Sequence, residues 1–280
     1  MVLNKIVLSK NKMTALIDPK KYTKTLDLLR SFFLSKNFLE VHTQNRLSIL
    51  AACEDPETVA TYEYNGEIWP LPQTGQMWLE YELLKNPDAA GFFCLSTSYR
   101  AEPNPVEGRH EVIFPMFEFE MHGGVEELKQ MEIELCEHLG LPPLNIKNYT
   151  EWGDLFNAKE LDHDHEKKIG SGMITDFPEW TSPFWNMARN TGQYVTGTSK
   201  KIDVILGGQE TIGSAERSTD KEQMRETFHT ISDGQYADLL YKLFGKERVE
   251  KELEEFLSFD FFPRSGGGIG VQRLMQAIPD

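Results

Sequence analysis

The sequence predicts an α+β fold in which helices cover a mainly antiparallel sheet. Strand-like segments occur in pairs joined by polar or Gly-Gly turns, which is typical of antiparallel hairpins. Helical stripes separate these pairs, so the helices are expected to cover the sheet. The chain has 280 residues and is 40% hydrophobic, which is enough for one large core. We expect residues 1–15 to be a short arm and residues 16–280 to form one domain.

The first helix is predicted to begin at Asp18, an N-cap residue followed by proline. An apolar stripe at spacings of four, three and four follows it, made of Tyr22, Leu26, Leu29 and Phe33. Such a stripe faces a core.

The remaining elements are predicted in order along the chain. They are a strand over 38–43, a helix over 76–85, strands over 91–102 and 111–121 joined by a polar loop (103–110), a helix through 128–139, an irregular stretch to about 180, two strands around a Gly-Gly turn within 201–217, helices over 220–231 and 234–257, and a glycine run before a last helix.

Composition restricts the class of protein. Lys and Arg total 29 against 44 Asp and Glu, a net charge of −15, which disfavours a protein that holds nucleic acid mainly by charge. The three cysteines, Cys53, Cys94 and Cys136, are too far apart for a zinc motif and are expected to be buried small residues. The sequence has neither a signal-like stretch nor an apolar run that would cross a membrane. A reducing cytoplasm fits these features.

The paired strands around the loop 103–110 carry side chains suited to binding a nucleotide. Arg100 and Glu102 are two apart on the first strand, and Phe114, Glu118 and Glu120 share a face of the second. A guanidinium grips phosphate, an aromatic ring stacks on a base, and a carboxylate accepts from an exocyclic amine. The alternative is a charged surface hairpin with an ordinary core phenylalanine.

The segment SGGGIGVQRLMQAI (265–278) places glycines before a helix, where backbone can approach an anion. The alternative is a flexible turn. The spacing matches neither a phosphate-binding P-loop nor a dinucleotide fingerprint. The acidic run from Asp162 to Glu166 is interpreted as a charged helix start, because consecutive helical residues cannot converge on one metal ion.

Several ordered motifs resemble class II aminoacyl-tRNA synthetases. LDLLRSFFLSKNFLEVHT (26–43), YRAEPNPVEGRHEVIFPMFEFE (99–120) and GGGIGVQR (266–273) resemble their motifs 1, 2 and 3. EWGDLFNAKELDHDHEKKIG (151–170), TDFPEWTSPFWNM (175–187) and GGQETIGSAER (207–217) narrow the resemblance to the aspartyl/asparaginyl subgroup, over about residues 20–280. The resemblance implies the antiparallel class II sheet flanked by helices, and ATP-dependent amino-acid activation.

The resemblance assigns an ATP site in motif 2. Arg100 is similar to the arginine that binds the α-phosphate, and Glu102 to the carboxylate that holds the adenine amino group. His110, with Arg109 as a second candidate, resembles the residue that reaches the γ-phosphate. Phe114 resembles the ring that stacks on adenine.

The resemblance also places a metal ion. Arg273 resembles the motif 3 arginine that covers adenine near the γ-phosphate, and Asp203 and Glu210 resemble the acidic pair that carries Mg²⁺ between ATP phosphates. The substrate carboxylate then attacks the α-phosphate in line, so catalysis is positioning plus charge neutralisation.

The predicted amino-acid pocket is of the asparaginyl type. LPQTGQMWLE (71–80) resembles the asparaginyl version of its segment, and Gln76 and Glu80 share a helix face. Arg217 resembles the arginine that holds the substrate side-chain oxygen, and Glu80 would accept from an amide. An aspartate would meet an unscreened charge there. Glu54 corresponds to the carboxylate that binds the α-amino group. The alternatives are that Glu80 is a solvated helix residue, and that the substrate is aspartate or an analogue.

Two departures bear on partners. Motif 1 has Thr43-Gln44 in place of its interface proline, although a homodimer is still expected. About twenty residues precede the first helix, too few for the anticodon-binding barrel of the relatives. We therefore expect weak tRNA binding and transfer of the activated amino acid to ammonia or another amine. The alternatives are tRNA charging through the core alone, and a non-catalytic paralogue that binds an amino acid or nucleotide.

Overall fold

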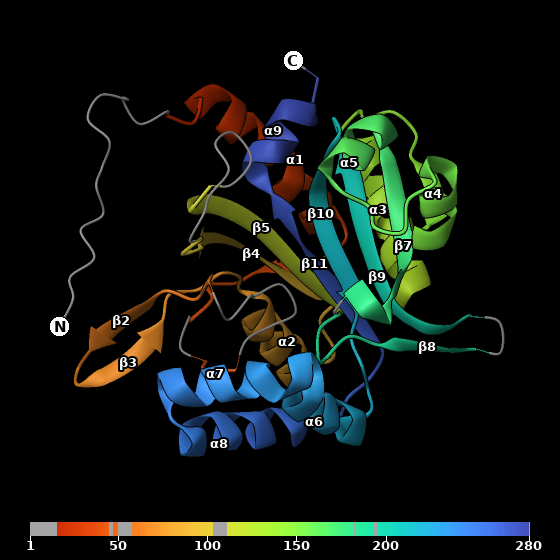
Figure 1. Cartoon of the computed structure of the whole chain (residues 1–280). Helices are drawn as coiled ribbons and strands as arrows, with labels where there is room; N and C mark the ends of the chain where they lie inside the picture. Colours follow the sequence, from red (N-terminus) through yellow and green to blue (C-terminus); the bar gives the residue numbers. More distant parts are fainter. Residues whose placement is uncertain are drawn as a thin grey trace, which may run out of the picture.

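The computed structural model describes residues 16–44, 47–49, 58–102, 111–181, 183–192 and 195–279. Its centre is a nine-stranded sheet with the order β1-β4-β5-β11-β10-β9-β7-β6, and β8 pairs with β9 outside this path (Figure 1). Only the pairs β1–β4 and β6–β7 are parallel among the paired strands of this sheet. The predicted α+β fold with a mainly antiparallel sheet is confirmed.

The elements of the described chain are as follows. The strands are β1 (Leu39–Glu40), β2 (Thr61–Tyr64), β3 (Glu67–Pro70), β4 (Gly91–Tyr99), β5 (Ile113–His122), β6 (Asn145–Asn148), β7 (Gly172–Pro178), β8 (Arg189–Gly192), β9 (Val195–Leu206), β10 (Gln209–Glu216) and β11 (Arg264–Gly270). The helices are α1 (Pro19–Ser35), α2 (Gln76–Lys85), α3 (Val125–His138), α4 (Tyr149–Phe156), α5 (His163–Ile169), α6 (Lys221–Thr230), α7 (Gln235–Phe244), α8 (Lys246–Leu257) and α9 (Val271–Ala277).

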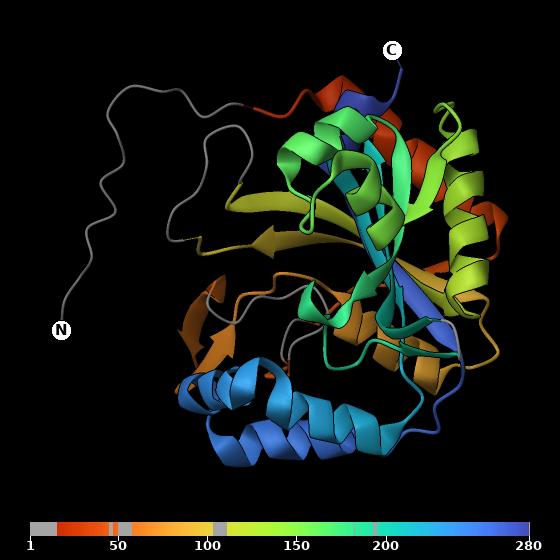
Figure 2. The same cartoon turned by 45° about the vertical axis from the view of Figure 1, so that its right-hand side comes forward.

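One face of the sheet is covered by α1, α3 and α9. The Asp18 side chain caps α1 by accepting from the backbone N–H groups of Lys20 and Lys21, as the sequence predicts. Leu29 and Phe33 of α1 are fully buried against Phe117 and Phe119 of β5. In Figure 2, α1 and α3 lie on the same side of the sheet. This packed face leaves the opposite face of the central strands for a site.

Helix α2 is held between the sheet and a three-helix layer, α6 to α8, that lies below the sheet in Figure 1. Its residues Leu79 and Leu83 pack on Phe92 of β4, while Met77 and Tyr81 join the core of α6–α8. A helix fixed on two sides places its remaining side chains firmly.

Residues 145–180 contain more regular secondary structure than was predicted from the sequence. This stretch was expected to be irregular, but it contains β6, α4, α5 and β7. These elements are short and depend on local caps: Asn148 accepts from the Glu151 N–H at the start of α4, and Asp162 caps α5. The charged helix start at Asp162 is thereby confirmed.

Several predicted boundaries are wrong for physical reasons. The helix expected over 234–257 is two helices, because Gly245 adopts φ 86° and breaks it. The strand expected over 38–43 is only two residues long. The glycine run is the central strand β11 rather than a loop, because it pairs with β5 and β10. Position 267 requires glycine, since a Cβ there would lie 2.5 Å from that of Ser214 on β10.

The hairpin β2–β3 escaped the sequence prediction. Its signal was the Asn65-Gly66 pair, in which both residues have positive φ, as a two-residue hairpin turn requires. Cys94 and Cys136 are buried and free, as predicted, while Cys53 lies outside the described residues. Within the described part of the chain, the helices are all too short or too polar to cross a membrane.

Candidate functional site

A row of two glycines between two carboxylates crosses the face of the sheet opposite α1 and α3. Glu118 of β5 pairs with Gly268 of β11, Gly268 with Gly213 of β10, and Gly213 with Asp203 of β9. Paired residues project to the same face, so two carboxylates flank two glycines. Three interstrand spacings separate them, about 14 Å. We call these four residues the glycine row; it has an acid at each end, and the Met116 methyl group lies 2.6 Å from the position a Cβ on Gly268 would take.

The arginine and the ring predicted to bind nucleotide lie together at the motif 2 end of this face. The Arg100 guanidinium carbon is 5.4 Å from the centroid of the Phe114 ring. Arg100 is fixed by a backbone hydrogen bond of 2.8 Å to the Val112 carbonyl. Its buried Nε has no hydrogen-bond partner among the described residues. A half-buried guanidinium whose buried Nε has an unused donor can receive an anion.

Only some of the other residues predicted to bind ATP lie within the described part of the chain. Glu102 is half-buried, two residues beyond Arg100. Arg109 and His110, and the predicted amino-group ligand Glu54, lie outside the described residues. Arg273 of α9 donates from Nη1 to the Glu210 carbonyl at 2.6 Å, which brings it beside the acidic pair.

Asp203 and Glu210 face the same space above Gly213. A Cβ built on Gly213 would lie 3.0 Å from Glu210 Oε1 and 3.7 Å from Asp203 Oδ1. Lys201 holds the other oxygen of Asp203 at 2.9 Å. Burial raises the pKa of Asp203 to about 7; Lys201 opposes this shift and the Glu210 charge adds to it. Two carboxylates that repel one another gain most from a shared cation.

The acidic pair fits a hard divalent cation. Asp203 Oδ1 is buried without a hydrogen-bond partner among the described residues, and glycine leaves room beside it. Mg²⁺ is typically bound by one or two carboxylates together with substrate phosphates and water. No cluster of three or more acidic, histidine or cysteine residues suited to a metal occurs in the described chain.

Two residues predicted to bind the amino-acid substrate, Gln76 and Glu80, meet Arg217 just after β10. Its Nη2 donates to Gln76 Oε1 at 2.7 Å and to Glu120 Oε2 at 3.2 Å. Burial raises the pKa of Glu120 to about 7, although the Arg217 charge opposes the shift. Gln76 in turn donates to the Gly267 carbonyl at 2.8 Å. Gln76, Arg217 and Glu120 therefore form one buried polar group beside the glycine row.

Glu80 belongs to the same polar group, but its charge is paired with arginines, whereas the sequence analysis expected an unscreened charge. It is fully buried, which excludes the solvated alternative. Its charge is not unscreened, since Arg264 Nη2 lies 2.6 Å from Oε2 and Arg217 Nε lies 3.6 Å from Oε1. Asn186 Nδ2 also donates to Oε1 at 2.8 Å. Asn186 and Arg264 could not be found from the sequence, because they lie 106 and 184 residues from Glu80 along the chain and form no local pattern with it. We call Gln76, Glu80, Glu120, Asn186, Arg217 and Arg264 the Arg217 cluster.

Glu118 anchors the start of α2. Its carboxylate accepts from the Gly75 N–H at 2.9 Å and from the hydroxyls of Thr74 and Ser96. Burial raises the pKa of Glu118, and these hydrogen bonds oppose the shift. A carboxylate tied to the first turn of α2 fixes where Gln76 lies relative to β5.

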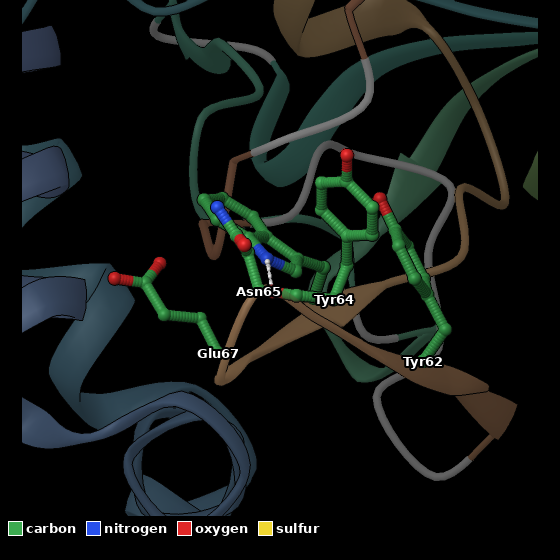
Figure 3. A pocket seen from close by; sticks show the side chains of 5 residues that line it. Tyr62, Tyr64, Asn65 and Glu67 are labelled. Atoms are coloured by element: carbon green, nitrogen blue, oxygen red, sulfur yellow. Dashed lines mark hydrogen bonds between the residues drawn. The ribbon is translucent and has the colours of Figure 1, made fainter.

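The hairpin β2–β3 stands beside the motif 2 strand. At its base Ala101 donates to the Thr58 carbonyl, and Tyr99 to that of Pro72, both at 2.8 Å. A hollow of about 440 Å³ on the hairpin is lined by Tyr62, Tyr64, Asn65, Glu67 and Trp69. Figure 3 shows the rings of Tyr62 and Tyr64 side by side, with Glu67 pointing away from them. Of the predicted site residues that the structure describes, none lines this hollow.

The chain belongs to the family of class II tRNA synthetases (D, K and N), whose model matches residues 4–280. This is the family expected from the motifs. None of the curated proteins matches the sequence.

Solved structures share the fold at low sequence identity. Asparaginyl-tRNA synthetase from Pyrococcus horikoshii, complexed with asparaginyl-adenylate, is 18% identical with a TM-score of 0.74, over 92% of this chain and 64% of that chain. The Entamoeba histolytica asparaginyl-tRNA synthetase, in complex with asparaginyl-adenylate, is 15% identical with a TM-score of 0.74, over 92% and 63%. Aspartyl tRNA synthetase from Entamoeba histolytica is 17% identical with a TM-score of 0.69, over 98% and 62%. The chain thus spans less than two thirds of the length of these structures.

Proposed function

We propose that this protein is an ATP-dependent, AMP-forming ligase that activates asparagine or aspartate as an aminoacyl-adenylate. The observation that carries the proposal is the glycine row, with an arginine–phenylalanine pair at one end, an acidic pair at the other and the Arg217 cluster beside it. A row of residues about 14 Å long has the span of an extended, two-part ligand. The family provides the reaction class.

In the proposed reaction a carboxylate oxygen of the amino acid attacks the α-phosphorus of ATP, and pyrophosphate leaves. Arg100 neutralises charge on the α-phosphate, and Phe114 stacks on the base. Arg273 acts near the leaving phosphates. Asp203 and Glu210 would hold Mg²⁺, which supplies further neutralisation of phosphate charge. No side chain of the protein forms a covalent bond, so rate enhancement comes from alignment and electrostatics.

The Arg217 cluster supports a small polar substrate side chain. Both signs of charge are present, in Arg217 and Arg264 against Glu80 and Glu120, so the cluster is close to neutral when all four are ionised. A neutral, hydrogen-bonding environment fits a carboxamide with one acceptor and two donors. The two asparaginyl-tRNA synthetases of similar fold hold asparaginyl-adenylate.

For the second half of the reaction we propose an amine acceptor other than tRNA. The amine nitrogen attacks the carbonyl carbon of the adenylate, AMP leaves, and the nitrogen loses a proton. A net charge of −15 opposes the approach of a polyanion and does not oppose ammonia or a small amine. A homodimer remains part of the proposal.

The test is amino-acid-dependent exchange of pyrophosphate into ATP, measured across the twenty amino acids. Exchange with asparagine or aspartate supports the proposal; its absence with all twenty overturns it. Candidate amines and bulk tRNA are then added to the preformed adenylate. AMP release that depends on an amine supports the acceptor, whereas stable aminoacylation of tRNA would make the protein a tRNA ligase.

A further inference from the structure

We infer that Asn186 reads the substrate side chain: its Oδ1 is the acceptor for the carboxamide N–H of asparagine, and Glu80 is not. The inference rests on the proposed function, because it presumes that the substrate side chain meets the Arg217 cluster. It adds a specificity residue and moves the acceptor from one side chain to another.

Protein donors already engage both oxygens of Glu80. Oε2 accepts from Arg264 Nη2 at 2.6 Å and from Arg264 Nε at 3.2 Å. Oε1 accepts from Asn186 Nδ2 at 2.8 Å and lies 3.6 Å from Arg217 Nε. Arg264 also donates to the Ser218 carbonyl at 3.2 Å, so it is held in place from a second side. Glu80 thus serves as a hydrogen-bonded counter-ion of the cluster.

The orientation of the Asn186 amide follows from this arrangement. If the amide were turned over, Oδ1 would face the carboxylate oxygen of Glu80 and two acceptors would repel one another. Nδ2 must therefore face Glu80, which turns Oδ1 to the other edge of the amide. Asn186 is fully buried, and Oδ1 has no hydrogen-bond partner within the described ranges.

A buried acceptor without a donor is unfavourable in the free protein and becomes paired when a ligand supplies an N–H group. The backbone sets this acceptor close to Arg217. Ser218 donates to the Asn186 carbonyl at 2.8 Å, and Met187 forms a β-bridge with Arg217. An arginine donor and an amide acceptor therefore come from two adjacent backbone segments.

Arg217 and Asn186 together select a substrate side chain by its hydrogen-bond donors and acceptors rather than by its size. A carboxamide can accept from Arg217 and donate to Asn186 at once. Aspartate offers a second oxygen in place of the NH₂ group, which would oppose Oδ1. The β-methyl ester of aspartate is neutral and keeps the carbonyl but has no N–H, so it separates the effect of charge from that of the donor.

The test compares exchange with asparagine, aspartate and aspartate β-methyl ester in the wild type and in Asn186→Leu, which keeps the branched shape and removes the amide. The wild type should prefer asparagine to the ester by about tenfold to a hundredfold in kcat/KM. In Asn186→Leu the asparagine-to-ester and asparagine-to-aspartate ratios should each fall by about tenfold or more. Asn190→Leu is the matched control, since Asn190 bonds Asp176 and Thr198 instead, and its ratios should match the wild type.

The outcomes separate the inference from the proposed function. Absence of exchange in the wild type with every amino acid overturns the proposed function and the inference with it. Wild-type exchange, with Asn186→Leu ratios within twofold of wild type, overturns the inference alone. If Asn186→Leu does not fold, the wild-type comparison decides: equal use of asparagine and the ester contradicts an N–H acceptor, and a strong preference for asparagine supports it.

Discussion

Arg264 and Glu80 form an ion pair of 2.6 Å in which neither side chain has exposed surface. The pair links the strand β11 to the helix α2 across 184 residues of sequence. Because the pair is buried, removal of either partner would leave the other as a buried charge without compensation. Within the Arg217 cluster, the Arg264–Glu80 pair therefore has a structural role, and other groups of the cluster are proposed to bind the substrate.

Removing one partner of this pair should be costly. Arg264→Met leaves Glu80 buried with less compensation, and we expect the free energy of unfolding to fall by about 3–5 kcal/mol. Urea denaturation followed by tryptophan fluorescence measures this. The double variant Glu80→Gln/Arg264→Met removes the uncompensated charge and should recover part of the loss. Additive losses from the two single changes would contradict this coupling.

Exchange activity should depend on the motif arginines independently of stability. Arg100→Ala removes the guanidinium beside Phe114, and Arg273→Ala removes the one beside Glu210. Each should lower pyrophosphate exchange by about a hundredfold or more, since oxyanion donors contribute on that scale. Arg225→Ala is the matched control, because Arg225 pairs only with Glu222 and Glu254 in the described chain. Wild-type exchange in either motif variant would mean that the nucleotide lies elsewhere.

The acidic pair should determine the Mg²⁺ requirement. Asp203→Asn or Glu210→Gln removes one hard oxygen ligand above Gly213 and should raise the Mg²⁺ concentration for half-maximal exchange by about tenfold or more. Asp154→Asn, an exposed change on α4, should leave it unchanged. An unaltered Mg²⁺ dependence in both acidic variants would remove this pair from the site.

The sequence could predict the sheet class and the region of the nucleotide because both rest on local patterns. Paired strands, the α1 stripe and the short spacing from Arg100 to Phe114 place side chains without knowledge of the rest of the chain. The face shared by Gln76 and Glu80 is likewise a helical spacing, and both side chains do approach Arg217.

What the sequence could not predict depends on distant pairing. The glycine run is a strand because it pairs with β5 and β10. Glu120 and Ser214 lie so close to it that Cβ atoms at positions 266 and 267 would clash, so glycine is required there. Arg264 and Asn186 have no motif spacing to Glu80, so only the folded sheet brings them together. Burial, which excludes the solvated alternative for Glu80, is also a property of the fold.

A further buried acid, Glu132 of α3, should make the stability of the protein depend on pH. Glu132 is fully buried on the helix-covered face of the sheet. Burial raises its pKa to about 8; the Ser214 hydroxyl opposes the shift and the Asp203 charge adds to it. The folded protein therefore binds this proton more tightly than the unfolded chain does.

Between about pH 4.5 and pH 8 the folded state holds a proton that the unfolded state has released, so the free energy of unfolding should fall as pH rises, by up to about 1.4 kcal/mol per pH unit from this group. Glu132→Gln keeps the volume and removes the titration. Its stability relative to wild type should increase from pH 5 to pH 8 and level off above that, in urea denaturation at each pH. The control Glu137→Gln, exposed on the same helix, should run parallel to the wild type. A Glu132→Gln difference that does not change with pH would show that Glu132 is ionised in the folded protein.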